Sequence, residues 1–198
     1  MVLLAVDIGG TFTDLVYFET DEATGRQTVH TAKVDTTPPD FDRGVLEVLA
    51  KADFNAADIS FLAHGTTVVI NALTERKGAV TGLITTQGFR DSLEIARGDR
   101  PDFFNLMYEK PVPFVPRYLR RELPGRMSYT GEERTPLDLT GLAAILDDFR
   151  GDGVQSIAIC LLHAYVNPAH EITIIAEVKR LWPEVVTVAS HQITREWR

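Results

Sequence analysis

The first 18 residues constrain the fold more than any other segment. Residues 2–8 (Val-Leu-Leu-Ala-Val-Asp-Ile) form a mostly apolar run that is typical of a buried strand, and Gly9-Gly10 marks a turn before a second apolar run at 13–18. So short a connection predicts an antiparallel hairpin. Residues 27–34 alternate weakly after a polar stretch, so we expect a third strand beside the second. An ordinary Rossmann order does not begin with such a meander.

Helices and strands alternate after the meander. Apolar residues at helical spacing predict an amphipathic helix entered through Pro38-Pro39-Asp40: Phe41, Val45, Val48, Leu49 and Ala52. A strand at 59–63, a helix at 66–77 ended by Gly78 and a strand at 80–85 are expected to form a parallel unit. Further helices are expected at 139–149 and 168–181, and further strands at 156–162 and 185–189. This order predicts an α/β fold with a mixed, ribonuclease H-like sheet.

Composition excludes several classes of protein. The 198 residues include 20 basic and 28 acidic side chains, a net charge of −8, which argues against nucleic acid or an anionic membrane surface as a partner. The sequence has no apolar run near the roughly 20 residues of a membrane-spanning helix and no signal-peptide pattern, so we expect a cytoplasmic protein. Its single cysteine, Cys160, excludes an internal disulfide and is expected in the core.

The glycine hairpin is the strongest candidate for a binding site. In Asp7-Ile-Gly-Gly-Thr-Phe-Thr-Asp14, the two glycines let the backbone approach an anion, and its amides with the Thr11 and Thr13 hydroxyls can donate to phosphate oxygens. Asp7 follows a buried strand, where an unpaired carboxylate is costly, so a Mg²⁺ partner is indicated. The alternative is a glycine turn with a capping aspartate.

A second candidate is His64-Gly-Thr-Thr67, where a strand is expected to end and a helix to begin. Ligands of α/β sheets tend to lie at such strand ends, and His64 can act as an acid or a base. Asn71 and Glu75, one and two helical turns beyond Thr67, can face the same space, but for Glu75 a solvated helix face is the favoured alternative. The alternative is an N-cap by Thr66 or Thr67 with no ligand.

A long segment at 96–116, rich in proline, is expected to be an ordered loop with a possible role in a site. Its Arg97 and Arg100 can clamp a carboxylate or phosphate, although surface ion pairs are the alternative. The sequence contains no P-loop, dinucleotide fingerprint or hydrolase nucleophile elbow. Nucleotide binding therefore requires another kind of fold.

Several ordered motifs resemble the N-terminal region of the hydantoinase A/5-oxoprolinase family. They are Val6-Asp-Ile-Gly-Gly-Thr-Phe-Thr-Asp14, His64-Gly-Thr-Thr67 leading into Asn71-Ala-Leu-Thr-Glu-Arg-Lys-Gly78, the segment 81–91, Arg100-Pro101, and Leu161-Leu-His-Ala-Tyr-Val-Asn-Pro-Ala-His-Glu171. The resemblance covers nearly the whole chain. It implies the first half of an actin-like, ribonuclease H-like ATPase, in agreement with the order of elements.

The resemblance also implies an activity. Family members use ATP and Mg²⁺ to phosphorylate a carbonyl-derived oxygen, either of a cyclic amide before hydrolysis or of a ketone before carboxylation. By resemblance, Asp7 holds the metal and the hairpin wraps the terminal phosphates through Gly9, Gly10, Thr11, Phe12 and Thr13. His64, as a catalytic group, is expected on the substrate side with Thr66, Thr67, Asn71, Arg97 and Arg100.

The same resemblance implies that residues 1–198 are the N-terminal domain of a longer chain, without the second ATPase domain and its share of the nucleotide site. It also implies a companion hydantoinase B-like subunit or domain. We place hydrolysis of a cyclic amide first, because members of this family are most often assigned that activity. The ketone carboxylase is the second alternative, because residues 97–105 and 109–117 look at least as similar to that branch as to hydantoinases. A non-catalytic assembly module and a sugar kinase or repressor are further alternatives, and the kinase does not explain His64-Gly-Thr-Thr67.

Overall fold

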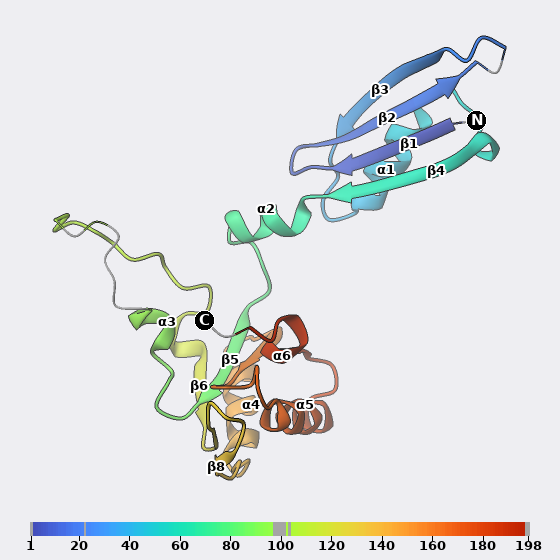
Figure 1. The fold of residues 1–198 in the computed structure, drawn as a ribbon. Helices are drawn as coiled ribbons and strands as arrows, with labels where there is room; N and C mark the ends of the chain where they lie inside the picture. The colour runs from blue at the N-terminus through green and yellow to red at the C-terminus, as the bar shows by residue number, and fades with distance from the viewer. Residues whose placement is uncertain (1, 22, 97–101, 103, 197–198) are drawn as a thin grey trace. The chain divides into compact units, whose positions relative to one another are not determined.

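A computed structural model describes residues 2–21, 23–96, 102 and 104–196 (Figure 1). The chain divides into two compact units, Met1–Gly78 and Ala79–Arg198, which are described separately. The division falls at Gly78, the residue expected to end a helix.

The first unit is built on a sheet with strand order β3-β2-β1-β4. Strands β1 (Val2–Ile8), β2 (Phe12–Thr20) and β3 (Gln27–Asp35) form the expected antiparallel meander, and β4 (Ile59–Thr66) is parallel to β1. The meander forms because each connection is short and each apolar run is long enough to bury one face.

One face of this sheet carries the core of the first unit. Helix α1 (Phe41–Ala50) packs against β1, β2 and β3, as Figure 1 shows. The residues buried there are Val2, Leu4, Val6, Leu15, Tyr17, Val34 and Val48. Because successive side chains of a strand alternate, Leu3, Ala5 and Asp7 point to the opposite face. A short 3-10 turn (Ala56–Asp58) precedes β4, and helix α2 (Val68–Thr74) follows it.

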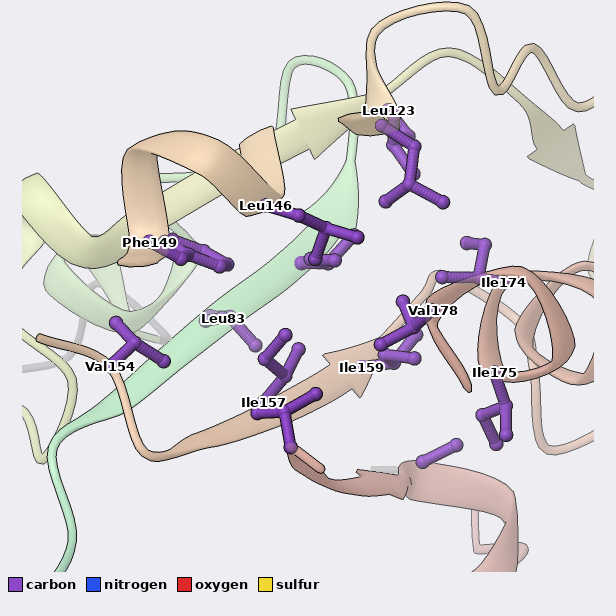
Figure 2. Packing of buried hydrophobic residues seen from close by; sticks show 14 of the residues in the cluster. Leu83, Leu123, Leu146, Phe149, Val154, Ile157, Ile159, Ile174, Ile175 and Val178 are labelled. Carbon is purple, nitrogen blue, oxygen red and sulfur yellow. The ribbon is translucent and has the colours of Figure 1, made fainter. Parts of the chain in front are cut away.

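The second unit is a parallel sheet with helices. Its strand order is β10-β9-β5-β6, from β5 (Thr81–Thr86), β6 (Arg120–Leu123), β9 (Ser156–Cys160) and β10 (Val186–Ala189). The helices are α3 (Ser92–Ile95), α4 (Leu142–Gly151), α5 (Ala169–Leu181) and α6 (Ser190–Ile193), with a 3-10 turn at Arg117–Leu119. A small antiparallel pair joins β7 (Arg126–Met127) to β8 (Glu133–Thr135). Figure 2 shows Leu83, Leu146, Phe149 and Ile157 meeting in the apolar core.

The expected parallel unit of β4, α2 and β5 is wrong. Strand β4 pairs with β1, whereas β5 pairs with β6 and β9 in another sheet. A crossover helix joins two parallel strands by packing on their sheet. Helix α2 has only seven residues and buries none of them, so it cannot hold β5 beside β4.

The Leu161–Glu171 motif has a structural role. The fully buried Glu171 carboxylate accepts hydrogen bonds from Leu161 N at 2.9 Å, Ser190 Oγ at 2.8 Å and His191 N at 3.1 Å, and lies 2.7 Å from His191 Nδ1. One carboxylate on α5 thus ties the segment after β9 to α6. Cys160, which closes β9, is exposed rather than in the core, because the strand alternation places Ile157 and Ile159 inward.

Segment 96–116 contains no helix or strand among its described members, residues 96, 102 and 104–116, as expected for a loop. No helix in the described ranges is both long and apolar enough to cross a membrane.

Candidate functional site

The site begins with the tight turn between β1 and β2. Gly9 N donates to Phe12 O at 2.9 Å, and neither Gly9 nor Gly10 has a positive φ. Glycine is needed at both positions because a side chain would be too close to neighbouring atoms. A Cβ on Gly9 would lie 2.9 Å from Phe12 O, and one on Gly10 would lie 2.8 Å from the Asn71 side-chain nitrogen. The backbone of the turn therefore lies close to the carbonyl of Phe12 on one side and to the Asn71 side chain of α2 on the other.

This turn presents hydrogen-bond donors without acceptors. Within the described residues, the amides of Gly10 and Thr11 and the Thr11 hydroxyl make no hydrogen bond, and both residues are exposed. Adjacent free backbone amides are a suitable donor set for phosphate oxygens. The hairpin thus offers the donors that the sequence predicts, at Gly10 and Thr11.

Thr13 and Phe12 differ from that expectation. Thr13 is fully buried, its Oγ1 lies 3.3 Å from Thr36 Oγ1, and Thr36 in turn donates to Gly9 O at 2.9 Å. Its hydroxyl therefore supports the hairpin from beneath, and its expected contact with phosphate stays a prediction. Phe12 is 41% exposed and lies under Lys33, whose Nζ is 4.6 Å from the ring centroid.

Asp7 lies at the carboxyl end of β1, on the face opposite α1. It is exposed, so the argument from a buried carboxylate does not hold. In the part of the chain that the structure describes, however, its carboxylate has no hydrogen bond and no ion pair. An oxygen donor that is open and unpaired fits Mg²⁺, which takes few protein ligands and completes its shell with water and phosphate. The described residues include no cluster of three or more His, Cys, Asp or Glu suited to a metal ion.

His64 does not share a face of the sheet with Asp7. The register pairs Asp7 with Gly65 and Val6 with His64, so the two side chains point to opposite sides. The structure therefore does not bring these two expected catalytic residues together on the sheet.

Thr66 and Thr67 join β1 to α2. Thr67 N donates to Ile8 O at 3.0 Å, and the Thr67 hydroxyl donates to the same oxygen at 3.4 Å. Thr66 Oγ1 accepts from Val68 N at 3.2 Å. Thr67 is the N-cap residue of α2 but makes no side-chain cap hydrogen bond, and the Thr66 contact is a local turn two residues long.

A cavity of about 450 Å³ lies beside the hairpin. Its lining residues are Gly9, Gly10, Pro38, Phe41, Val68, Asn71, Ala72, Glu75 and Lys77. Asn71 and Glu75 both line this space, and Glu75 is exposed, as favoured for a solvated helix face. Asn71 also donates to Thr67 Oγ1 at 3.2 Å, which anchors its amide at the cavity wall.

Sequence reasoning missed Pro38, Phe41 and Lys77 in this lining. The predicted meander was the sequence signal that could have placed these residues beside the hairpin. Strands β2 and β3 stay paired as far as Phe12 and Asp35, and Thr36 N donates to Thr11 O at 2.8 Å. The segment that leads into α1 must therefore return to the hairpin. Lys77 is paired with Glu75 at 2.9 Å, and the hydrogen bond and charge of Glu75 raise the pKa of Lys77 above its usual value. The cavity thus has a persistent cation at its wall.

Arg97 and Arg100 lie outside the described residues.

Gly10→Ala tests the packing of the hairpin on α2. The new methyl group would displace the Asn71 amide, which lies 2.8 Å from the Cβ position, and would break its bond to Thr67. We expect about tenfold weaker binding of a nonhydrolysable ATP analogue to the full-length protein, roughly the cost of one lost hydrogen bond. Calorimetric titration measures it. Gly78→Ala is the matched control, since a Cβ there meets nothing within 4 Å; equal affinities of the two variants would contradict the expectation.

Comparison with known sequences gives a family. Residues 3–181 match the family model described as the hydantoinase/oxoprolinase N-terminal region. The chain is 36% identical over 200 residues to the caprolactamase subunit alpha of Pseudomonas jessenii, covering 96% of this chain and 28% of that protein. It is 30% identical over 209 residues to the acetophenone carboxylase gamma subunit of Aromatoleum aromaticum, covering 95% and 28%. The chain thus spans little more than a quarter of the length of these relatives.

Solved structures give the fold. A nucleotide-free acetone carboxylase matches with a TM-score of 0.81 at 24% identity, over 99% of this chain and 30% of that one. An ATP-dependent caprolactamase from Pseudomonas jessenii matches with a TM-score of 0.79 at 32% identity, over 98% and 29%. The expected α/β fold of the ribonuclease H-like, actin-like type is confirmed. The chain therefore belongs to the hydantoinase/oxoprolinase family and contains its N-terminal region.

Proposed function

We propose that this chain is the N-terminal part of an ATP-dependent enzyme subunit that phosphorylates the amide oxygen of a cyclic amide before the ring is hydrolysed. The observation that carries the proposal is the hairpin at the end of β1. There the unpaired Asp7 carboxylate stands next to free amides of Gly10 and Thr11. A carboxylate for Mg²⁺ beside backbone donors for phosphate is what positions a phosphoryl group for transfer.

Each residue of the site has a role in this proposal. Asp7 holds Mg²⁺, which when bound neutralises charge on the phosphate oxygens. Gly9 makes the turn possible, and Gly10 and Thr11 donate to phosphate. Thr13 and Thr36 hold the turn from below. Arg97 and Arg100 stay predictions from the family resemblance, as substrate clamps.

The chemistry follows from activating a poor electrophile. The terminal phosphoryl group of ATP passes to the amide oxygen, and ADP leaves. Water then adds to the carbon of the phosphorylated imidate, and the ring C–N bond breaks with the amine as leaving group, which leaves an acyl phosphate. A second water hydrolyses the acyl phosphate, so that phosphate departs and an amino acid is formed. Little covalent work falls to the protein, whose groups position the reactants and stabilise charge.

The cavity beside the hairpin supports a cyclic amide as substrate. Phe41, Val68 and Ala72 supply an apolar wall for ring methylenes, and Asn71 supplies an amide at the same wall. A cyclic amide presents one N–H and one C=O on a single edge, and a carboxamide side chain can pair with both. His64 is not among the residues that line this cavity, so this arrangement gives it no role.

The relative named as a caprolactamase subunit has 36% identity, against 30% for the acetophenone carboxylase subunit, which favours the hydrolase over the ketone carboxylase. Both relatives are named as subunits, so we propose that this protein also acts with a companion hydantoinase B-like subunit. We propose a cytoplasmic location, because ATP is available there and the chain has one cysteine.

The test is ATP consumption by the full-length subunit with its companion. Phosphate release on caprolactam, hydantoin or 5-oxoproline without bicarbonate supports the hydrolase. Consumption that requires acetone or acetophenone, with bicarbonate carbon in the product, replaces it with the carboxylase. Complex formation without ATP use on any of these compounds indicates an assembly module.

We also propose that residues 1–198 hold only part of the nucleotide site, the rest belonging to a second ATPase domain of the longer protein. The chain spans 28% of the caprolactamase subunit, which leaves room for such a domain. We therefore expect the 198-residue chain alone to bind Mg-ATP poorly and to turn over nothing. Calorimetry that found tight binding by this chain would contradict the division of the site.

A further inference from the structure

The row of side chains around Asp7 suggests how its carboxylate is kept open for a metal. On the face opposite α1, one row of paired residues crosses all four strands of the sheet. Asp7 on β1 lies opposite Asp14 on β2 and Gly65 on β4, and Asp14 lies opposite Lys33 on β3. Side chains paired directly across strands have Cβ atoms roughly 4.5–5.5 Å apart, so two carboxylates here are neighbours.

Lys33 neutralises only one of the two carboxylates. Its Nζ lies 3.1 Å from Asp14 Oδ1 and 4.6 Å from the centre of the Phe12 ring. The ion pair and the ring hold the ammonium on the β3 side of the row. Asp7 is left without a cation among the described residues.

Gly65 makes room for Asp7 on the other side. A Cβ on Gly65 would lie only 3.2 Å from Asp7 Oδ1 and 3.9 Å from its Cγ. The Asp7 carboxylate therefore extends over β4, where a side chain is missing. Asp14 is drawn toward β3 by Lys33, so the two like charges separate.

We propose that Gly65 and the Lys33–Asp14 ion pair are the positioning groups of Asp7: the glycine fixes where the carboxylate lies, and the ion pair removes Asp14 as a competing ligand. The inference rests on the proposed function, in which Asp7 binds Mg²⁺. It gives roles to Gly65, Lys33 and Asp14, to none of which the sequence analysis assigned a role of its own.

The two parts of the proposal predict opposite effects on metal binding. Gly65→Ala crowds Asp7 Oδ1, so metal affinity is expected to fall on the order of tenfold, as when a group that orients a ligand is altered. Lys33→Met frees the Asp14 carboxylate beside Asp7. A second negative charge about 5 Å away is expected to tighten divalent binding by roughly tenfold.

The experiment measures Mn²⁺ binding to the full-length subunit by electron paramagnetic resonance, with a nonhydrolysable ATP analogue present. Circular dichroism checks that each variant is folded. The double variant Lys33→Met/Asp14→Asn should return to the wild-type affinity, because Asp7 again has no charged neighbour. Gly78→Ala and Arg43→Met are the matched controls: the first glycine has nothing within 4 Å of its Cβ position, and the second change breaks an exposed ion pair with Glu47 on α1.

Wild-type affinity in Gly65→Ala, or unchanged or weaker binding in Lys33→Met, overturns the inference. Should Gly65→Ala not fold, the Lys33→Met and double variants decide the outcome. Failure of the proposed function gives another pattern: wild type and Asp7→Asn then bind Mn²⁺ equally, and no site at Asp7 exists to be positioned. The two failures are thus distinguishable within one series.

Discussion

Asp7→Asn in the full-length subunit is expected to lower ATP-dependent turnover at least a hundredfold while the subunit still assembles with its companion. Asparagine has nearly the shape of aspartate but no charge, and loss of one group that stabilises developing charge costs about 10²–10³ in rate. Because Asp7 is exposed and makes no contact in the described chain that folding needs, the fold should be unaffected. Phosphate release under saturating substrate measures turnover, and size-exclusion chromatography measures assembly.

Asp58→Asn is the matched control. Asp58 is also exposed, but it immediately precedes β4, whereas the hairpin lies at the end of β1 that is beside the last residues of β4. Its substitution should leave turnover unchanged. Full turnover in Asp7→Asn would remove the carboxylate from the mechanism and with it the proposed metal site.

Phe149→Ala should destabilise the second unit by about 3–5 kcal/mol, the usual cost of removing a buried aromatic ring. Phe149 is fully buried in α4, and Figure 2 shows its ring among Leu83, Leu146 and Val154. The ring packs so closely on β5 that a Cβ on Gly82 would lie 2.7 Å from it. A small side chain at 149 therefore leaves a cavity that the sheet cannot easily fill.

Urea unfolding followed by tryptophan fluorescence measures this effect. Trp182 packs against the apolar core of the second unit, so its fluorescence reports the unfolding of that unit. Ile172→Ala is the control: this side chain is 52% exposed on α5, and its removal should change stability by about 0.5 kcal/mol or less. Equal losses in the two variants would show that Phe149 is not part of a close-packed core.

Much of the fold could be predicted from apolar periodicity, and the exceptions have clear causes. Helices α1 and α4 have clear helical patterns, and these helices, the meander and α5 are present near the expected positions. Strand β6 begins Arg120-Arg121-Glu122, which is the opposite of a buried strand pattern. Arg120 is nevertheless buried, because Val115 O accepts from its Nε at 2.9 Å and Glu94 from its Nη2 at 2.8 Å. Glu94 is 26 residues from Arg120 in the sequence, so no local pattern predicts this partner.

The sequence predicts where the candidate site lies, but it does not predict the contacts that its residues make. The glycine motif correctly indicated a hairpin with free donors. Which face of a strand a residue occupies depends on register, and one position reverses it. Thr13 and His64 lie on the same face of the sheet as Val6, and Asp7 lies on the opposite face. The motif residues that the sequence places near one another therefore belong to two different faces. Only pairing between strands separates them.

The chain keeps two apolar cores that have no residue in common, one under α1 and one between the parallel sheet and α4 and α5. This arrangement has a consequence for sequence divergence. Substitutions that repack one core leave the packing of the other unchanged, because coupling between substitutions is strongest among side chains in contact. Residues of the second core can therefore be substituted among relatives without changing the sheet beneath the glycine hairpin. The register that places Asp7 on the outer face of that sheet depends on the first core alone.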